Sequence, residues 1–160
     1  MNSIFPASID PYPLACSWPL FERDQHFDLG CTFDWGDATA ADFSIDADML
    51  AAQGVGVWDC DLRDDSLTWS AAVHDLFGLP RGIRVLRATP VALYVEPSRA
   101  AMERLRAYAI KHRRGFTLDV EILPANGGHR WIRLAAAPVC VEGRPVRLRG
   151  FKRDVSHDYA

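Results

Sequence analysis

The sequence has few cysteines and no long apolar run. Its four cysteines lie far apart, with no Cys-x-x-Cys pair and no histidines clustered near them. That spacing argues against a zinc site and against a disulfide framework, so we expect reduced thiols. No stretch comes near the roughly 20 apolar residues that a helix needs to cross a bilayer. Residues 1–20 carry four prolines and no basic start, unlike a signal peptide. We therefore expect a cytoplasmic protein without membrane insertion.

Motifs for catalysis are also missing from the sequence. The chain contains no nucleophile elbow, no phosphate-binding loop and no run of metal ligands. Asp59, Asp119 and Glu121 lie on predicted strands and could form a paired acid site. Solvation or pairing with a cross-strand arginine is the better interpretation, with Arg133 as the expected partner of Glu121. The sequence therefore predicts no catalytic residue and no metal site, and the protein is not expected to be an enzyme.

Charge is distributed unevenly along the 160 residues. Residues 1–50 hold nine Asp or Glu against one Arg, whereas residues 51–160 hold 17 Lys or Arg against 12 Asp or Glu. The two parts therefore carry −8 and +5, which together give the net charge of −3. An acidic segment that docks on a basic body and two separately solvated surfaces both fit this division. The positive excess is too small for nucleic-acid binding to be expected.

The N-terminal part of the chain is predicted to be an arm rather than a second domain. Residues 1–40 are dense in Pro, Asp and Gly yet contain seven aromatic side chains, which disordered tails rarely have. We expect an acidic arm over residues 1–40, a capping helix within residues 41–54 and a folded domain over residues 55–157. The helix has more apolar side chains than a solvated cap needs, which predicts a dimer interface. Its candidates are Phe43, Ile45, Met49 and Leu50.

Hydrophobic periodicity predicts five strands and two main helices in the folded domain. Helices are expected between Ser70, as N-cap, and Gly78, and over residues 97–112, with Gly115 ending the second. Residues 79–95 show no clear pattern. This order of strands, helices and strands predicts an α+β domain with an antiparallel sheet. The predicted strands are residues 55–62, 67–69, 116–122, 131–141 and 145–151.

Five short segments, in order and with their spacing, carry a family resemblance. They are GVWDCDL (56–62), LTWS (67–70), LFGL (76–79), NGGHRWIR (126–133) and RGFKRDVS (149–156). Together they resemble the PAS domain family of bacterial signalling proteins, in the class with two tryptophans in the first hairpin, over roughly residues 50 to 157. The resemblance implies a PAS fold, a five-stranded antiparallel sheet with helices packed on one face. The chain departs from the family at Glu96-Pro97-Ser98-Arg99, where His-Pro-Asp-Asp is common.

The resemblance also implies a function in signal transduction. PAS domains sense small ligands or mediate docking and dimerisation, and they regulate histidine kinases or cyclic-di-GMP enzymes in cis or in trans. It implies a homodimer with a signalling protein partner or a covalently linked effector domain. The alternative is a small pocket enzyme or carrier on a cupped antiparallel sheet. That alternative requires a carboxylate or a histidine that points inward.

Large side chains on the predicted sheet and helices could line a ligand cavity or simply fill the core. The candidates are Trp58, Trp69, Phe77, Leu105 and Trp131. The sequence identifies no cofactor and argues against flavin and haem. Flavin photochemistry in this fold needs a reactive cysteine on the central helices, whereas Cys60 and Cys140 fall on strands. A haem needs an axial histidine. His112 is expected at the surface, and a surface position is also the better interpretation for His74, which could otherwise face the pocket.

Overall fold

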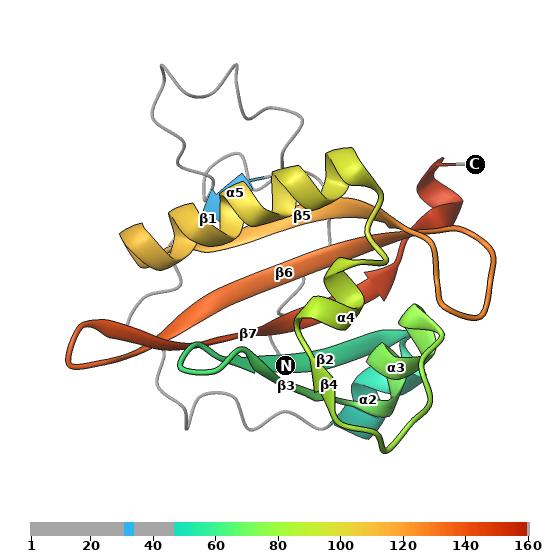
Figure 1. Ribbon diagram of the computed structural model, residues 1–160, viewed down its shortest axis with the longest axis horizontal. Helices are drawn as coiled ribbons and strands as arrows, with labels where there is room; N and C mark the ends of the chain where they lie inside the picture. The colour runs from blue at the N-terminus through green and yellow to red at the C-terminus, as the bar shows by residue number, and fades with distance from the viewer. Residues whose placement is uncertain (1–30, 34–46, 160) are drawn as a thin grey trace.

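One antiparallel sheet organises the fold. In the computed structural model, which describes residues 31–33 and 47–159, seven strands hydrogen-bond in the order β1-β5-β6-β7-β2-β3-β4. β7 occupies the centre of the sheet although it is the last of these strands in the chain (Figure 1). The strands are β1 Cys31–Phe33, β2 Val55–Asp61, β3 Ser66–Trp69, β4 Val85–Leu86, β5 Gly115–Ile122, β6 Arg130–Val141 and β7 Arg144–Asp154.

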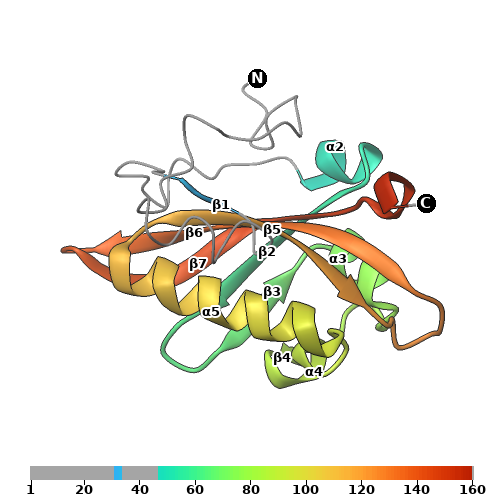
Figure 2. The ribbon, with the colours of Figure 1, turned by 90° about the horizontal axis from the view of Figure 1, so that it is seen from above.

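The helices divide between the two faces of the sheet. α3 (Ala71–Phe77), α4 (Ala88–Val91) and α5 (Glu96–His112) cover one face, which we call the inner face. α2 (Ala47–Ala52) and the C-terminal 3₁₀ turn η3 (Ser156–Tyr159) lie on the opposite, outer face (Figure 2). None of the helices among residues 47–159 is long and apolar enough to cross a membrane.

The predicted α+β architecture is confirmed. All five predicted strands are present and antiparallel, and helices pack on one face of their sheet. β1 and β4 are short additions at the two edges that the sequence did not predict. Residues 79–95, which show no clear sequence pattern, contain β4 and α4.

Buried and half-buried side chains alternate along β5, and this alternation distinguishes the two faces of the sheet. Phe116, Leu118, Val120 and Ile122 of β5 are all buried in the main core between the sheet and the inner helices. The residues between them are half-buried on the outer face. A second, smaller cluster on the outer face consists of Val55, Ala135 and Phe151.

The helix ends follow the prediction in part. Ser70 occupies the N-cap position of α3, but its Oγ accepts a hydrogen bond from the backbone N–H of Val57 at 2.9 Å instead of capping the helix. Gly78 ends α3 in the left-handed conformation, as predicted, and a Cβ there would lie 2.1 Å from Oδ1 of Asn126. α5 ends at His112, as predicted, but the residue predicted to end it was wrong. Arg113 is its left-handed C-cap, because Gly115 is already the first residue of β5.

The predicted capping helix is described only in its second half. α2 begins at Ala47, so Phe43 and Ile45 lie outside the described residues, as does the side chain of Met49. Leu50 is half-buried and packs against the Val55–Ala135–Phe151 cluster of the outer face. Of the predicted acidic arm, the structure describes only β1, which pairs with β5 at the edge of the sheet.

Candidate functional site

A lysine lies inside the domain, on the central strand. Lys152 of β7 pairs in register with Gly56 of β2 and Leu134 of β6, and its side chain is only 6% exposed. Alternation along β7 places Lys152 on the same inner face as Leu148, because the two are four residues apart in one strand. The last of the five predicted strands ended at Phe151, so sequence reasoning missed Lys152. The period-two pattern, continued one residue further, would have found it.

Aromatic rings surround the ammonium group of Lys152. Its Nζ lies 5.1 Å from the ring centroid of Trp58, 5.7 Å from that of Trp69 and 4.8 Å from that of Phe77. These are cation–π distances. Among the described residues, Lys152 has no hydrogen-bond acceptor and no carboxylate partner.

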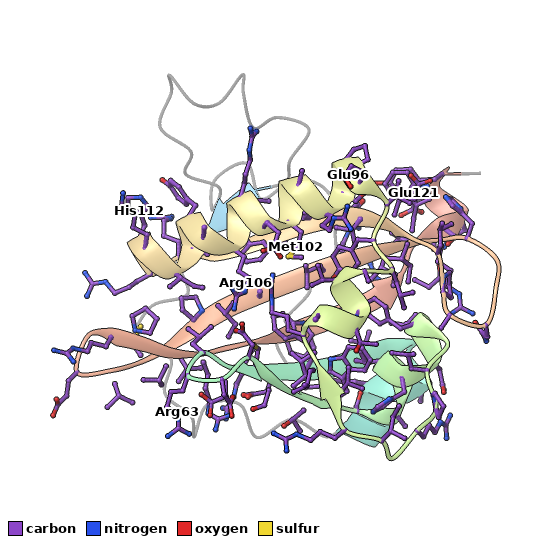
Figure 3. The ribbon with its side chains drawn as sticks, in the orientation of Figure 1. Arg63, Glu96, Met102, Arg106, His112 and Glu121 are labelled. Atoms are coloured by element: carbon purple, nitrogen blue, oxygen red, sulfur yellow. The ribbon has the colours of Figure 1, made fainter. Side chains whose placement is uncertain are left out.

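A cavity of about 40 Å³ lies beside Lys152, between the inner face of the sheet and helices α4 and α5. Met102 and Arg106 extend toward it from α5 (Figure 3). No Asp or Glu of the described part of the chain lines it. Its lining consists of Trp58, Cys60, Leu67, Arg87, Pro90, Val91, Tyr94, Met102, Arg106, Phe116, Leu134, Leu148 and Lys152.

The two arginines of the cavity are paired, whereas the lysine is not. Arg87 forms an ion pair with Glu103 of α5. Arg106 donates to Asp65, in the turn between β2 and β3, over 3.1 Å between Nη2 and Oδ1. Both acids are partly exposed and neither lines the cavity. Lys152 is therefore the cationic side chain of this cavity that lacks a counter-charge within the described residues.

Burial shifts the titration of the groups around the cavity. It lowers the pKa of Lys152 from 10.5 to about 7, a shift that the Cys60 thiol opposes and the Arg87 charge reinforces. Burial also raises the pKa of Cys60, against the influence of Arg106. Burial therefore disfavours the charged form of Lys152, and its charge near neutral pH responds to changes in its surroundings.

The structure brings together three of the five predicted ligand-site residues. Trp58, Trp69 and Phe77 surround Lys152, and Trp69 stacks on Phe77 with ring centroids 5.0 Å apart. Leu105 is buried in the same core without lining the cavity. Trp131 lies elsewhere, where its ring stacks on that of Tyr159 of η3 at 4.1 Å.

One histidine differs from its prediction. His74 is buried, with its ring edge-on to Trp69 at 5.1 Å between centroids, so its expected surface position was wrong. Its Nδ1 has no hydrogen-bond partner among the described residues. Its position three residues before Phe77 on α3 was the available signal, since residues at that spacing share a helix face. His112 is exposed at the end of α5, as predicted (Figure 3).

Carboxylates and arginines pair across the outer face of the sheet. Asp59 of β2 accepts hydrogen bonds from Nη1 of Arg147 and Nε of Arg149 of β7, both at 2.5 Å. The sequence predicted cross-strand arginine partners for the strand carboxylates, and Asp59 has them. These contacts leave Asp59 fully engaged in ion pairs rather than in an acid site.

A second arginine pair corrects a detail of the prediction. Nε and Nη2 of Arg133 donate to the two carboxylate oxygens of Asp119 at 2.7 and 2.8 Å. Arg133 was expected to pair with Glu121, which instead contacts His129. The register explains the difference, because Asp119 lies directly opposite Arg133 whereas Glu121 lies opposite Trp131.

Comparison with known proteins identifies the fold. The PAS fold family model matches residues 47–155. No curated protein matches the chain. A sensory box histidine kinase/response regulator from Burkholderia thailandensis is 18% identical, with a TM-score of 0.59 over 69% of this chain and 83% of that one. The N-terminal domain of a diguanylate cyclase with PAS/PAC sensor from Marinobacter aquaeolei is 17% identical, with a TM-score of 0.61 over 66% and 99%. A LOV domain of a blue-light activated histidine kinase from Erythrobacter litoralis is 20% identical, with a TM-score of 0.52 over 63% and 95%.

Proposed function

The chain belongs to the PAS fold family, and from that premise we propose that it is a signal-transduction module that senses a small ligand in its interior. We propose further that it regulates a histidine kinase or a cyclic-di-GMP enzyme, either as part of the same chain or as a separate partner. The observation that carries the proposal is Lys152, a buried cation on the central strand beside a cavity. A buried charge without a partner destabilises a fold, so its presence favours a role in binding.

The alternative, a small pocket enzyme or carrier, has less support. It requires a carboxylate or histidine directed into the pocket. Within the described residues no carboxylate lines the cavity, and the buried His74 contacts the ring of Trp69 and is not among the lining residues. The sensor is therefore the function that this geometry favours.

Two neighbouring residues of β7 give the signal a route across the sheet. Lys152 points to the cavity, whereas Phe151 points to the outer face, where it packs with Val55 and Ala135 beneath Leu50 of α2. A shift of the backbone at Lys152 must therefore move the contacts of α2, since successive side chains of a strand point to opposite faces. We propose that α2 carries the state of the cavity to the effector.

Dimerisation forms part of this proposal. The half-buried position of Leu50 on the outer face is compatible with an interface that also uses Phe43, Ile45 and Met49. We expect a homodimer in sedimentation velocity at micromolar concentration, and a shift toward monomer in Leu50→Asp. Arg104→Asp, on the exposed side of α5, is the matched control. A monomer at all concentrations would contradict the dimer without affecting the ligand proposal.

Domain organisation and location complete the proposal. We assign the PAS domain to residues 55–157, with a capping helix over 41–54 and an acidic arm over 1–40. Cys60 and Cys140 are free thiols, which fit the reducing conditions of the cytoplasm, where we place the protein.

A fusion with a reporter enzyme tests the signalling function. The full chain is joined to a diguanylate cyclase domain through seven helical linkers that differ by one residue, so that every helical phase is sampled. We expect Lys152→Met to change cyclic-di-GMP synthesis severalfold in at least one phase. Lys111→Met makes the same exchange at an exposed position and leaves the output unchanged. Equal output from wild type and Lys152→Met in all seven fusions would overturn the proposed function.

A further inference from the structure

We propose that the cavity beside Lys152 binds a small anion with oxygen acceptors, either a carboxylate or an inorganic oxyanion, of about three or four heavy atoms. This inference rests on the proposed function, because it names the class of ligand that the sensor reports. Three features of the cavity support it: its hydrogen-bond donors, its charge and its size.

Donors outnumber acceptors at the cavity. The Lys152 ammonium has no acceptor among the described residues, and the indole Nε1–H of Trp58, another lining residue, is buried without a partner there. The Arg87 and Arg106 side chains line the same space. Neither an ammonium nor an indole N–H can accept a hydrogen bond. The ligand must therefore supply acceptor atoms.

The charge of the lining selects an anion over a neutral acceptor. Three cationic side chains line the cavity, and the carboxylates of Glu103 and Asp65 offset the two arginines from outside it. The positive charge of Lys152 is left for the ligand to neutralise. Hydrogen bonds between ionised groups are about twice as strong as neutral ones, which makes an oxyanion the complementary class.

The size of the cavity limits the ligand to a few atoms. A volume of about 40 Å³ holds about three water molecules. Formate, acetate and nitrate are of this size, whereas a nucleotide or a flavin is far larger. The rings of Trp58 and Phe77 lie 5.1 and 4.8 Å from Nζ of Lys152 and are both buried.

Binding of an anion must be coupled to protonation of Lys152. The pKa of Lys152 is about 7, and an anion bound beside it favours the ammonium form and raises that pKa. Affinity therefore falls with rising pH, by up to about tenfold per pH unit, between the pKa of Lys152 without the anion and its raised pKa with the anion bound, because binding then has to take up a proton. Several other titratable or charged groups lie around Lys152. Across the cavity or behind the aromatic rings they are Cys60 of β2, His74 of α3, Arg106 of α5, and Arg87 and Tyr94 on either side of α4.

The chain has only two lysines, which makes this coupling directly measurable. The 160-residue chain is labelled with ¹³C-lysine, and the Cε resonances of Lys111 and Lys152 are followed by NMR while sodium formate, acetate or nitrate is added at constant ionic strength. Lys111→Arg assigns the two signals. We expect a saturable shift of the Lys152 resonance alone, together with a rise in its pKa.

Variants test which side chains hold the anion. Lys152→Met should weaken binding at least about tenfold, as measured by the ligand-induced rise in melting temperature. Arg106→Met should weaken it about threefold to tenfold, whereas Arg104→Met, two residues away on the exposed side of α5, should leave it unchanged. The wild-type titration is informative even if a variant fails to fold.

The outcomes separate this inference from the proposed function. Binding of formate and acetate alone identifies a carboxylate site, and binding of nitrate as well identifies a general oxyanion site. Equal shifts at both lysines, or no shift with any of the three anions, overturn the inference. If the cyclase fusions still depend on Lys152 in that case, the sensing function stands with another class of ligand. If they do not, both fail.

Discussion

The two faces of the sheet treat charge in opposite ways. On the outer face, Arg133 forms a bidentate pair with Asp119, and Arg147 and Arg149 share Asp59. On the inner face, Lys152 contacts aromatic rings and has no carboxylate among the described residues. The outer face thus uses charge to tie neighbouring strands together, whereas the inner face holds an uncompensated charge next to a cavity. The comparison teaches that charged side chains stabilise the sheet on the outer face, whereas on the inner face apolar packing stabilises it around a single unpaired cation.

The largest expected effect comes from removing a ring of the inner face. Phe77 is fully buried and stacks on both Trp69 and Tyr94. Phe77→Ala should lower the free energy of unfolding in urea by about 3–5 kcal/mol, because it leaves a cavity in the core. The outer-face control, Trp131→Ala, should cost roughly 1 kcal/mol, since that ring is half-buried and mainly stacks on Tyr159. Similar losses of stability in the two variants would contradict the difference that we expect between inner-face and outer-face rings.

Removing the charge on each face should change stability in opposite directions. At pH 6, Lys152→Met should raise the free energy of unfolding by roughly 1–4 kcal/mol, because an apolar side chain of similar length replaces a buried cation. Arg133→Met should lower it by about 1–3 kcal/mol, because Asp119 is then left half-buried without its bidentate partner. A loss of stability in Lys152→Met would show that its cation–π contacts outweigh the cost of burial.

The stability of the wild type should rise with pH near neutrality. The pKa of Lys152 is about 7 in the folded domain and 10.5 when exposed, so between these values the unfolded chain binds the extra proton. The free energy of unfolding should therefore increase by roughly 1.5 kcal/mol from pH 7 to pH 8.5. The measurement stops at pH 8.5, because the raised pKa of Cys60 acts in the opposite direction at higher pH. Lys152→Met should lack this increase, and an identical increase in the variant would refute the assignment.

The smallest change in stability is expected from breaking an exposed ion pair that lies outside the sheet. Arg81 contacts Asp75 at 2.6 Å, with both side chains more than half exposed. Arg81→Met should change the free energy of unfolding by less than about 0.5 kcal/mol, because solvent screens an exposed pair. A loss comparable to that of Arg133→Met would mean that position in the sheet does not decide the strength of these pairs.

The sequence was sufficient for the architecture but not for the site. Alternation placed Phe116, Leu118, Val120 and Ile122 on one face, and the structure confirms it. The partner of Arg133 could not be predicted, because the register of β5 and β6 depends on the conformation of the loop between them. Lys152 was missed for a different reason. The period-two pattern of β7 reaches it, but a lysine at the end of a strand ordinarily marks an exposed position, and the three rings that enclose it meet only in the tertiary structure.

The central position of β7 in the sheet has a consequence for folding while the chain is being synthesised on the ribosome. β2 and β6, the neighbours of β7, are synthesised before it, and each has an unpaired edge until β7 emerges and joins them. A nascent chain that is stalled before residue 144 therefore exposes two unpaired strand edges, which can hydrogen-bond with other chains. Because Lys152 and Leu148 both belong to β7, the cavity that they line forms only after β7 has paired with β2 and β6.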